Sequence, residues 1–119
     1  MVNFRHLATA LAILFAAAIG PARAEGFLSV YEDLPLAPGL AEVAGSGLSF
    51  DSPAGRIVEA HAHGAVKTAE VLHFYASTLP QLGWTRETDK LYRREAEVLR
   101  LETANDHGGL SIRFAISPE

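Results

Sequence analysis

The C-terminal part of the chain alternates apolar and polar residues with a period of two. Such alternation places successive side chains on opposite faces of a β-sheet, and short connections join neighbouring antiparallel strands. The pattern therefore predicts a four-stranded meander with one apolar face and one charged face. Its strands are expected at residues 84–88, 91–95, 97–103 and 110–117. The inward-facing residues of the last two strands are Leu99, Leu101, Leu110, Ile112, Phe114 and Ile116.

A helical period precedes the meander, between residues 68 and 82. Apolar residues recur there at intervals that place them along one side of a helix. Thr68 is the expected N-cap, Pro80 should bend the last turn, and Gly83 should end the helix. The apolar stripe consists of Val71, Leu72, Tyr75, Leu79 and Leu82.

Two extended arms, residues 48–51 and 55–63, flank a Ser-Pro-Ala-Gly turn and predict a hairpin. In the second arm, small and apolar residues share one face, which suits close packing against a helix. These residues are Val58, Ala60 and Ala62, whereas the opposite face carries Ile57, Glu59, His61 and His63.

Together these elements predict an α+β fold, a two-layer sandwich with one main helix packed on a mostly antiparallel sheet of five to six strands. The chain order is β-hairpin, helix, β-meander. From the connection lengths, the last strand is expected to pair antiparallel with the second arm of the hairpin. The predicted strand order across the sheet is 48–51, 55–63, 110–117, 97–103, 91–95 and 84–88.

The N-terminal residues 1–24 have the features of a secretory signal peptide. Arg5 precedes an apolar run, Leu7–Gly20, which is shorter than the roughly 20 residues that span a bilayer, and Ala22 and Ala24 suit a cleavage site. We expect cleavage after Ala24 and a periplasmic or secreted protein without stable membrane insertion; an uncleaved anchor is the alternative.

Residues 25–47 then predict a loop-rich leader packed on an α+β domain of residues 48–119. Pro35 and Pro38 disfavour a helix in the leader. Its leucines are expected to contact the core, and residues 25–30 are expected to fray.

The charge and the cysteine count exclude several function classes. The chain has 14 acidic and 10 basic residues, for a net charge of −4. Loss of Arg5 and Arg23 with the signal peptide would leave 8 basic residues and a net charge of −6, which does not indicate nucleic-acid binding. The absence of cysteine excludes disulfides, thiol catalysis and cysteine-bound zinc. Cross-strand ion pairs are expected on the exposed sheet face among Glu59, Arg100, Glu102 and Arg113.

Two short motifs resemble a group of small secreted bacterial proteins of unassigned function. The first is an acidic-Leu-Pro-x-x-Pro-Gly leader and the second is Phe-Tyr-x-x-x-Leu-x-x-x-Gly-Trp. Lys67 departs from the group, which has a serine-type cap near this position. The resemblance implies the fold and the compartment, and it carries no catalytic residues. The matching residues are Asp33, Leu34, Pro35, Pro38, Gly39, Phe74, Tyr75, Leu79, Gly83 and Trp84.

The best candidate for chemistry is a possible metal site formed by Glu59, His61 and His63. Alternate residues of a strand point the same way, so both imidazoles can approach one Zn²⁺ or Cu²⁺ ion. A solvated strand face carries polar residues in any case, and no third ligand is fixed by the sequence, since His107 lies in a turn and His73 on the helix. We therefore expect weak Zn²⁺ or Cu²⁺ binding at most and no other cofactor.

No catalytic constellation is present in the sequence. There is no Gly-x-Ser-x-Gly elbow, no cysteine nucleophile and no phosphate-binding loop. The preferred hypothesis is a non-catalytic periplasmic module that binds another envelope protein or a small ligand on its open sheet face or at a sheet edge. The alternatives are a periplasmic metal-binding protein that uses the His-x-His strand, and a small hydrolase or lyase.

Overall fold

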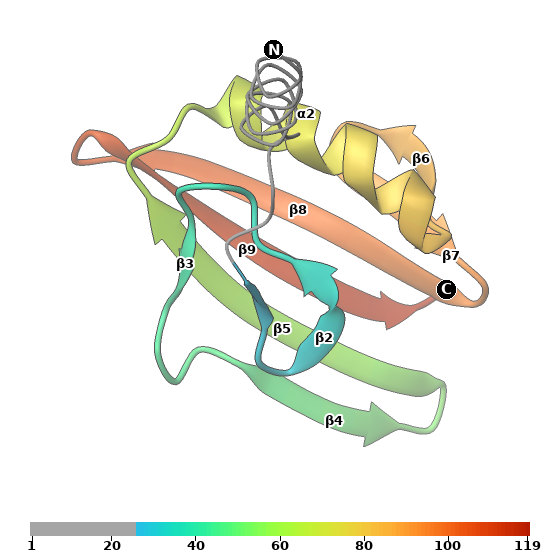
Figure 1. Cartoon of the computed structure of the whole chain (residues 1–119). Helices are drawn as coiled ribbons and strands as arrows, with labels where there is room; N and C mark the ends of the chain where they lie inside the picture. Colours follow the sequence, from blue (N-terminus) through green and yellow to red (C-terminus); the bar gives the residue numbers. More distant parts are fainter. Residues whose placement is uncertain (1–25) are drawn as a thin grey trace, which may run out of the picture.

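The computed structural model of the chain describes residues 26–119, so the predicted signal peptide and its cleavage point lie outside the described residues. A seven-stranded antiparallel sheet dominates the structure, and a separate two-stranded sheet precedes it (Figure 1). No helix within residues 26–119 is long and apolar enough to cross a bilayer. The elements are β1 (Phe27–Leu28), β2 (Tyr31–Pro35), β3 (Ala41–Glu42), β4 (Leu48–Ser52), β5 (Gly55–Gly64), α2 (Thr68–Thr78), the 3₁₀ helix η1 (Leu79–Leu82), β6 (Thr85–Thr88), β7 (Leu91–Arg94), β8 (Glu97–Asp106) and β9 (Gly109–Pro118).

The predicted fold class, a two-layer α+β sandwich with a main helix, is wrong. Strands make up 55% of the described residues and helices 16%, so the protein is mostly β with one short helix and a large antiparallel sheet. Length explains the difference. The 11 residues of α2 extend only about 16 Å at 1.5 Å per residue, whereas the 10 residues of β8 or β9 extend about 33 Å. The helix therefore covers only part of the sheet.

The predicted strand order is confirmed. The main sheet has the order β3-β5-β9-β8-β7-β6, and β4 pairs with β5 along the same edge as β3. β5 and β9 are antiparallel, with Val58 opposite Ile116 and Gly64 opposite Leu110. The short β7–β8 and β8–β9 connections fix these neighbours, and α2 carries the chain from β5 to the far edge of the sheet.

The apolar face of the sheet forms the core. The residues that the alternation assigns to this face are buried. Ala60 and Ala62 of β5 are buried beside β9, as are the leucines of β8. Trp84, which opens the next segment after the helix, is 2% exposed. All the predicted inward-facing residues of β8 and β9 are buried: Leu99, Leu101, Leu110, Ile112, Phe114 and Ile116.

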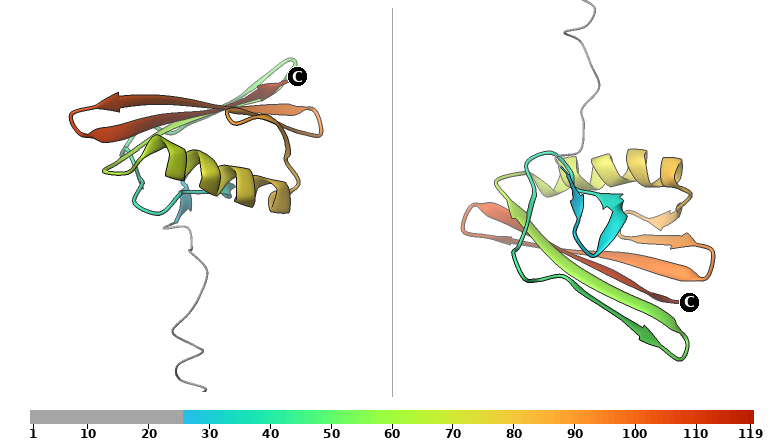
Figure 2. Two further views of the ribbon diagram at one scale, coloured as in Figure 1. Left: turned by 90° about the horizontal axis from the view of Figure 1, so that it is seen from above. Right: turned by 60° about the horizontal axis from the view of Figure 1, so that its bottom comes forward.

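The leader covers the part of the apolar face that the helix leaves open. β1 and β2 lie on the same side of the sheet as α2 (Figure 2). Leu34, Leu36 and Leu40 belong to the core cluster, which confirms their predicted contact with the core. The predicted fraying of residues 25–30 is wrong for β1, because Leu28 is buried and its strand pairs with β2.

The two ends of the helical segment differ in how well they match the prediction from the sequence. Lys67 is the N-cap in place of the predicted Thr68, and its side chain makes no capping hydrogen bond. At the other end Pro80 lies in the 3₁₀ turn η1, and Gly83 closes the turn with a φ of 92°. The predicted end at Gly83 holds for the 3₁₀ turn that contains Pro80, whereas α2 itself already ends at Thr78. Only a residue without Cβ adopts the φ of Gly83 at low cost.

Candidate functional site

The sheet face that points away from α2 carries the residues that the sequence singles out. Glu59, His61 and His63 alternate along β5 with the buried Val58, Ala60 and Ala62, and both histidines are exposed. This placement is the one that the strand pattern predicts. The three side chains therefore share one face.

The carboxylate of Glu59 forms an ion pair with Arg113. Arg113, on the neighbouring β9, donates from Nε and Nη2 to Glu59 Oε1 at 2.8 and 2.7 Å. Arg113 Nη1 also donates to Glu102 Oε1 on β8 at 2.9 Å. The predicted cross-strand ion pairs thus form among Glu59, Arg113 and Glu102, whereas within residues 26–119 Arg100 has no ion-pair partner.

The histidines have other neighbours. His63 Nε2 lies 3.8 Å from Asp106 Oδ1, and both side chains are about half exposed. Among the described residues, no group of three or more His, Asp or Glu side chains is arranged to hold a metal ion. The structure therefore places Glu59, His61 and His63 on one face without assembling them as a ligand set. Weak Zn²⁺ or Cu²⁺ binding by the two histidines stays a prediction.

An exposed apolar strip lies beside these residues, on β4. Leu48 is opposite Glu59 and Phe50 is opposite Ile57, so both belong to the open face. Leu48 is 48% exposed and Phe50 is 49% exposed. Two large apolar side chains half in water on one short strand are a feature of binding surfaces.

β4 is also an edge strand with a free outer side. Its only pairing in the described part of the chain is with β5, and it lies at the border of the sheet (Figure 1). Free edges can pair with another chain, and proteins usually prevent this with lysine, proline, a bulge or inward charges. β4 has the sequence Leu-Ser-Phe-Asp-Ser, pairs with β5 in unbroken register, and carries a single charge, Asp51.

The opposite edge of the sheet, β6, provides a contrast. It carries the charged residues Arg86 and Glu87, and its register with β7 shifts between Arg86 and Thr88. These are two of the features that discourage pairing with another chain. The structure thus has one protected edge and one unprotected edge. This difference between the edges is not among the predictions from the sequence, although the turn after Ser52 determines which residues of β4 lie on the open face.

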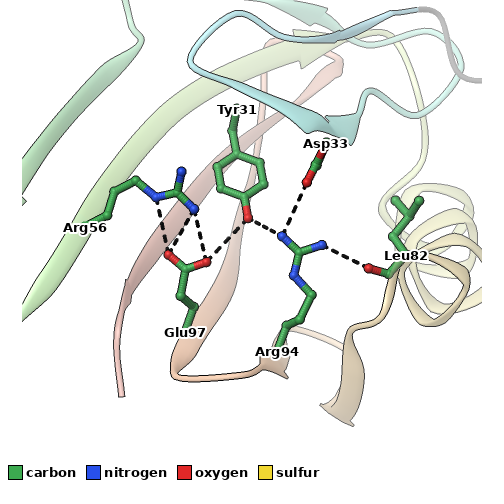
Figure 3. A network of polar contacts seen from close by, with 6 residues as sticks. All are labelled: Tyr31, Asp33, Arg56, Leu82, Arg94 and Glu97. Carbon is green, nitrogen blue, oxygen red and sulfur yellow. Dashed lines mark hydrogen bonds and ion pairs between the residues drawn. The ribbon is translucent and has the colours of Figure 1, made fainter.

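A second candidate is a polar cleft of about 790 Å³ between the leader and the β7–β8 hairpin. Tyr31 of β2 reaches into it between two arginines (Figure 3). Its hydroxyl accepts a hydrogen bond from Arg94 and donates to Glu97 Oε1 at 3.4 Å. Arg56 pairs with the same carboxylate at 3.2 Å, and its guanidinium stacks over the tyrosine ring. Burial raises the pKa of Tyr31.

Arg94 connects further parts of the cleft. It donates to the carbonyl of Leu82 at 2.9 Å and lies 3.6 Å from the carboxylate of Asp33. Its guanidinium also lies 4.5 Å from the centre of the Trp84 ring. The arginines and Glu97 therefore already have partners inside the protein. We interpret these contacts as structural: they attach Tyr31 of the leader to β5, β7 and β8.

Comparison of the chain with protein-family models, with curated proteins and with solved structures finds no match.

Proposed function

We propose that the protein is a non-catalytic binding module of the bacterial cell envelope, which docks a partner protein by strand addition along β4. The observation that carries the proposal is the combination of a free, unprotected edge with the half-exposed Leu48 and Phe50. An added strand would hydrogen-bond to the outer side of β4, and its side chains would cover the apolar strip.

The polar cleft supports this choice over a catalytic one. Tyr31, Arg56, Arg94 and Glu97 satisfy one another, and a general acid or base needs a group that is free to reach its substrate. A site for a small ligand there would have to break several of these contacts. The network is better suited to holding the leader in place.

Site-directed photo-crosslinking in intact cells tests the proposal. A photo-reactive amino acid in place of Leu48 should give an adduct with a partner protein, and Phe50→Lys in the same chain should remove that adduct. The lysine places a charge where the partner strand would lie. The matched control carries the photo-reactive residue in place of Thr88, on the protected edge β6, and should give no Phe50-dependent adduct. Adducts from position 48 that persist with Phe50→Lys would contradict the proposal.

A further inference from the structure

The sequence of β4 is complementary to itself when two copies run antiparallel. The strand has five residues with Phe50 at its centre. A twofold axis at Phe50 places Leu48 opposite Ser52 of the second copy and Ser49 opposite its Asp51. All five residues find a partner in this register. We propose that the partner strand is β4 of a second copy of this chain, an inference that rests on the proposed function of β4.

The charges favour this arrangement. Asp51 is the one charged residue of β4, and the twofold axis places it opposite a serine hydroxyl that can donate to the carboxylate. Like charges directly opposite each other destabilise a strand pair. A parallel, in-register pair would place the two Asp51 carboxylates side by side, so the antiparallel register is preferred.

The apolar side chains favour it as well. Phe50 of each copy would lie directly opposite the other, with Cβ atoms about 5 Å apart, a separation at which aromatic cross-strand pairs are stabilising. Leu48 of one copy would lie diagonal to Phe50 of the other. Ile57, which pairs with Phe50 on β5, extends the same strip. The two sheets would thereby join edge to edge into one continuous sheet, with the Phe50 and Leu48 side chains of both copies packed together at its centre.

The size of the contact predicts a weak dimer. One five-residue edge per copy buries less than the roughly 1,200 Å² at the lower limit of standard stable interfaces. With the expected removal of residues 1–24 each copy carries a net charge of −6, so two copies repel each other, and salt screens this repulsion. The dimer should therefore form at high protein concentration, and its affinity should increase as ionic strength rises. Binding to a different, basic protein would show the opposite dependence, because salt would screen the attraction.

Analytical ultracentrifugation of the protein isolated from cells that produce the full-length chain tests the dimer. The weight-average mass should rise toward twice the monomer mass as concentration increases. Phe50→Lys should remain monomeric, because two ammonium groups would then lie opposite each other. Thr88→Lys adds the same charge to the β6 edge and should associate like the wild type. A wild type that stays monomeric throughout, or a Phe50→Lys variant that associates equally well, would overturn the inference.

The absence of native cysteine makes the register testable by disulfide trapping. A mixture of Ser49→Cys and Asp51→Cys proteins should form a mixed disulfide dimer on mild oxidation, because the twofold axis places these positions opposite each other. Each variant alone should form much less. Equal trapping in the separate and mixed samples would overturn the proposed register.

The two proposals fail in distinguishable ways. If the isolated protein is monomeric while position 48 still gives Phe50-dependent adducts with a different protein in cells, β4 is a docking strand and the second-copy inference is wrong. If neither association nor any Phe50-dependent adduct occurs, both proposals are wrong. An adduct with the mass of two copies supports both.

Discussion

The hydroxyl of Tyr75 is buried where the leader crosses the helix. It donates to the carbonyl of Pro35 at 2.8 Å and accepts from the backbone N–H of Ala37 at 3.2 Å. The ring packs edge-on against Phe114 of the sheet, with 5.7 Å between the ring centres. One side chain thus joins the leader, the helix and the sheet.

Tyr75→Phe tests this role at alkaline pH. Burial raises the pKa of Tyr75 above the ordinary value of 10.0, so the unfolded chain releases a proton that the folded protein retains. Its contribution to the free energy of unfolding is therefore complete below about pH 10 and is lost as the pH rises through the folded pKa. Urea unfolding across this range should show a steeper loss for the wild type than for Tyr75→Phe. At neutral pH the variant should lose about 1–3 kcal/mol, because Pro35 and Ala37 lose a buried partner. Identical pH profiles would contradict the assignment.

Trp84 provides a second test at this scale. The side chain is 2% exposed, and its Nε1–H has no hydrogen-bond partner among residues 26–119. Trp84→Ala should lower the free energy of unfolding by about 3–5 kcal/mol and give a poorly folded protein. Trp84→Phe keeps an aromatic ring and removes the unpartnered N–H, so thermal melting should place it between the alanine variant and the wild type. An alanine variant that melts within a degree or two of wild type would contradict the burial of Trp84.

The exposed histidines lead to a prediction about metal binding. We expect His61 and His63 to bind Cu²⁺ or Zn²⁺ only loosely, since a tight structural zinc site normally has four ligands and Glu59 is paired with Arg113. Calorimetric titration should give weak binding that acid abolishes and that does not change the melting temperature. His73→Ala, an exposed change on α2 at the opposite side of the sheet, is the control. Submicromolar one-to-one binding that His63→Ala removes would show that a third ligand exists.

Among the elements, β1 and β2 of the leader form a sheet of their own, so we expect that their attachment can be weakened without a change in β8 and β9. Tyr31 and Arg94 form the leader's polar contact with the β7–β8 hairpin. Tyr31→Phe should accelerate hydrogen exchange in β1 and β2 and leave β8 and β9 unchanged. Glu32→Gln, an exposed change on the same strand, is the control. Equal exchange in wild type and Tyr31→Phe would show that the apolar contacts of Leu28 and Leu34 hold the leader unaided.

The elements differ in how far the sequence predicts them. β5, β8 and β9 have ten residues each, long enough for alternation to reveal both the strand and its inward face. β1 and β3 have two residues each and carry no periodic signal. The contacts of Tyr31 join residues far apart in the sequence, so no local pattern indicates them. The exposed strip of β4 could be predicted from the hairpin turn. A turn that pairs Ser52 with Gly55 also pairs Phe50 with Ile57, which places Phe50 on the open face.

At the scale of the whole molecule, the sheet has two different faces and two different edges. One face is covered by the short helix and the leader together, and the other is open (Figure 2). The β6 edge is charged and irregular, whereas the β4 edge is regular and carries the half-exposed Leu48 and Phe50. The surface available for a partner is therefore the corner where the open face meets β4.

A role in the cell envelope requires that the chain is exported. We expect the mature protein in the periplasmic fraction to begin at Glu25, because small residues at positions −3 and −1 precede it. Ala24→Leu should block cleavage and leave the precursor membrane-bound, whereas Ala17→Leu, within the apolar run, should be processed normally. N-terminal sequencing of both variants and of the wild type measures this. A wild-type protein that begins at Met1 in cells with working export would show that residues 1–24 are retained, and the strand-addition proposal would then apply to a membrane-anchored chain.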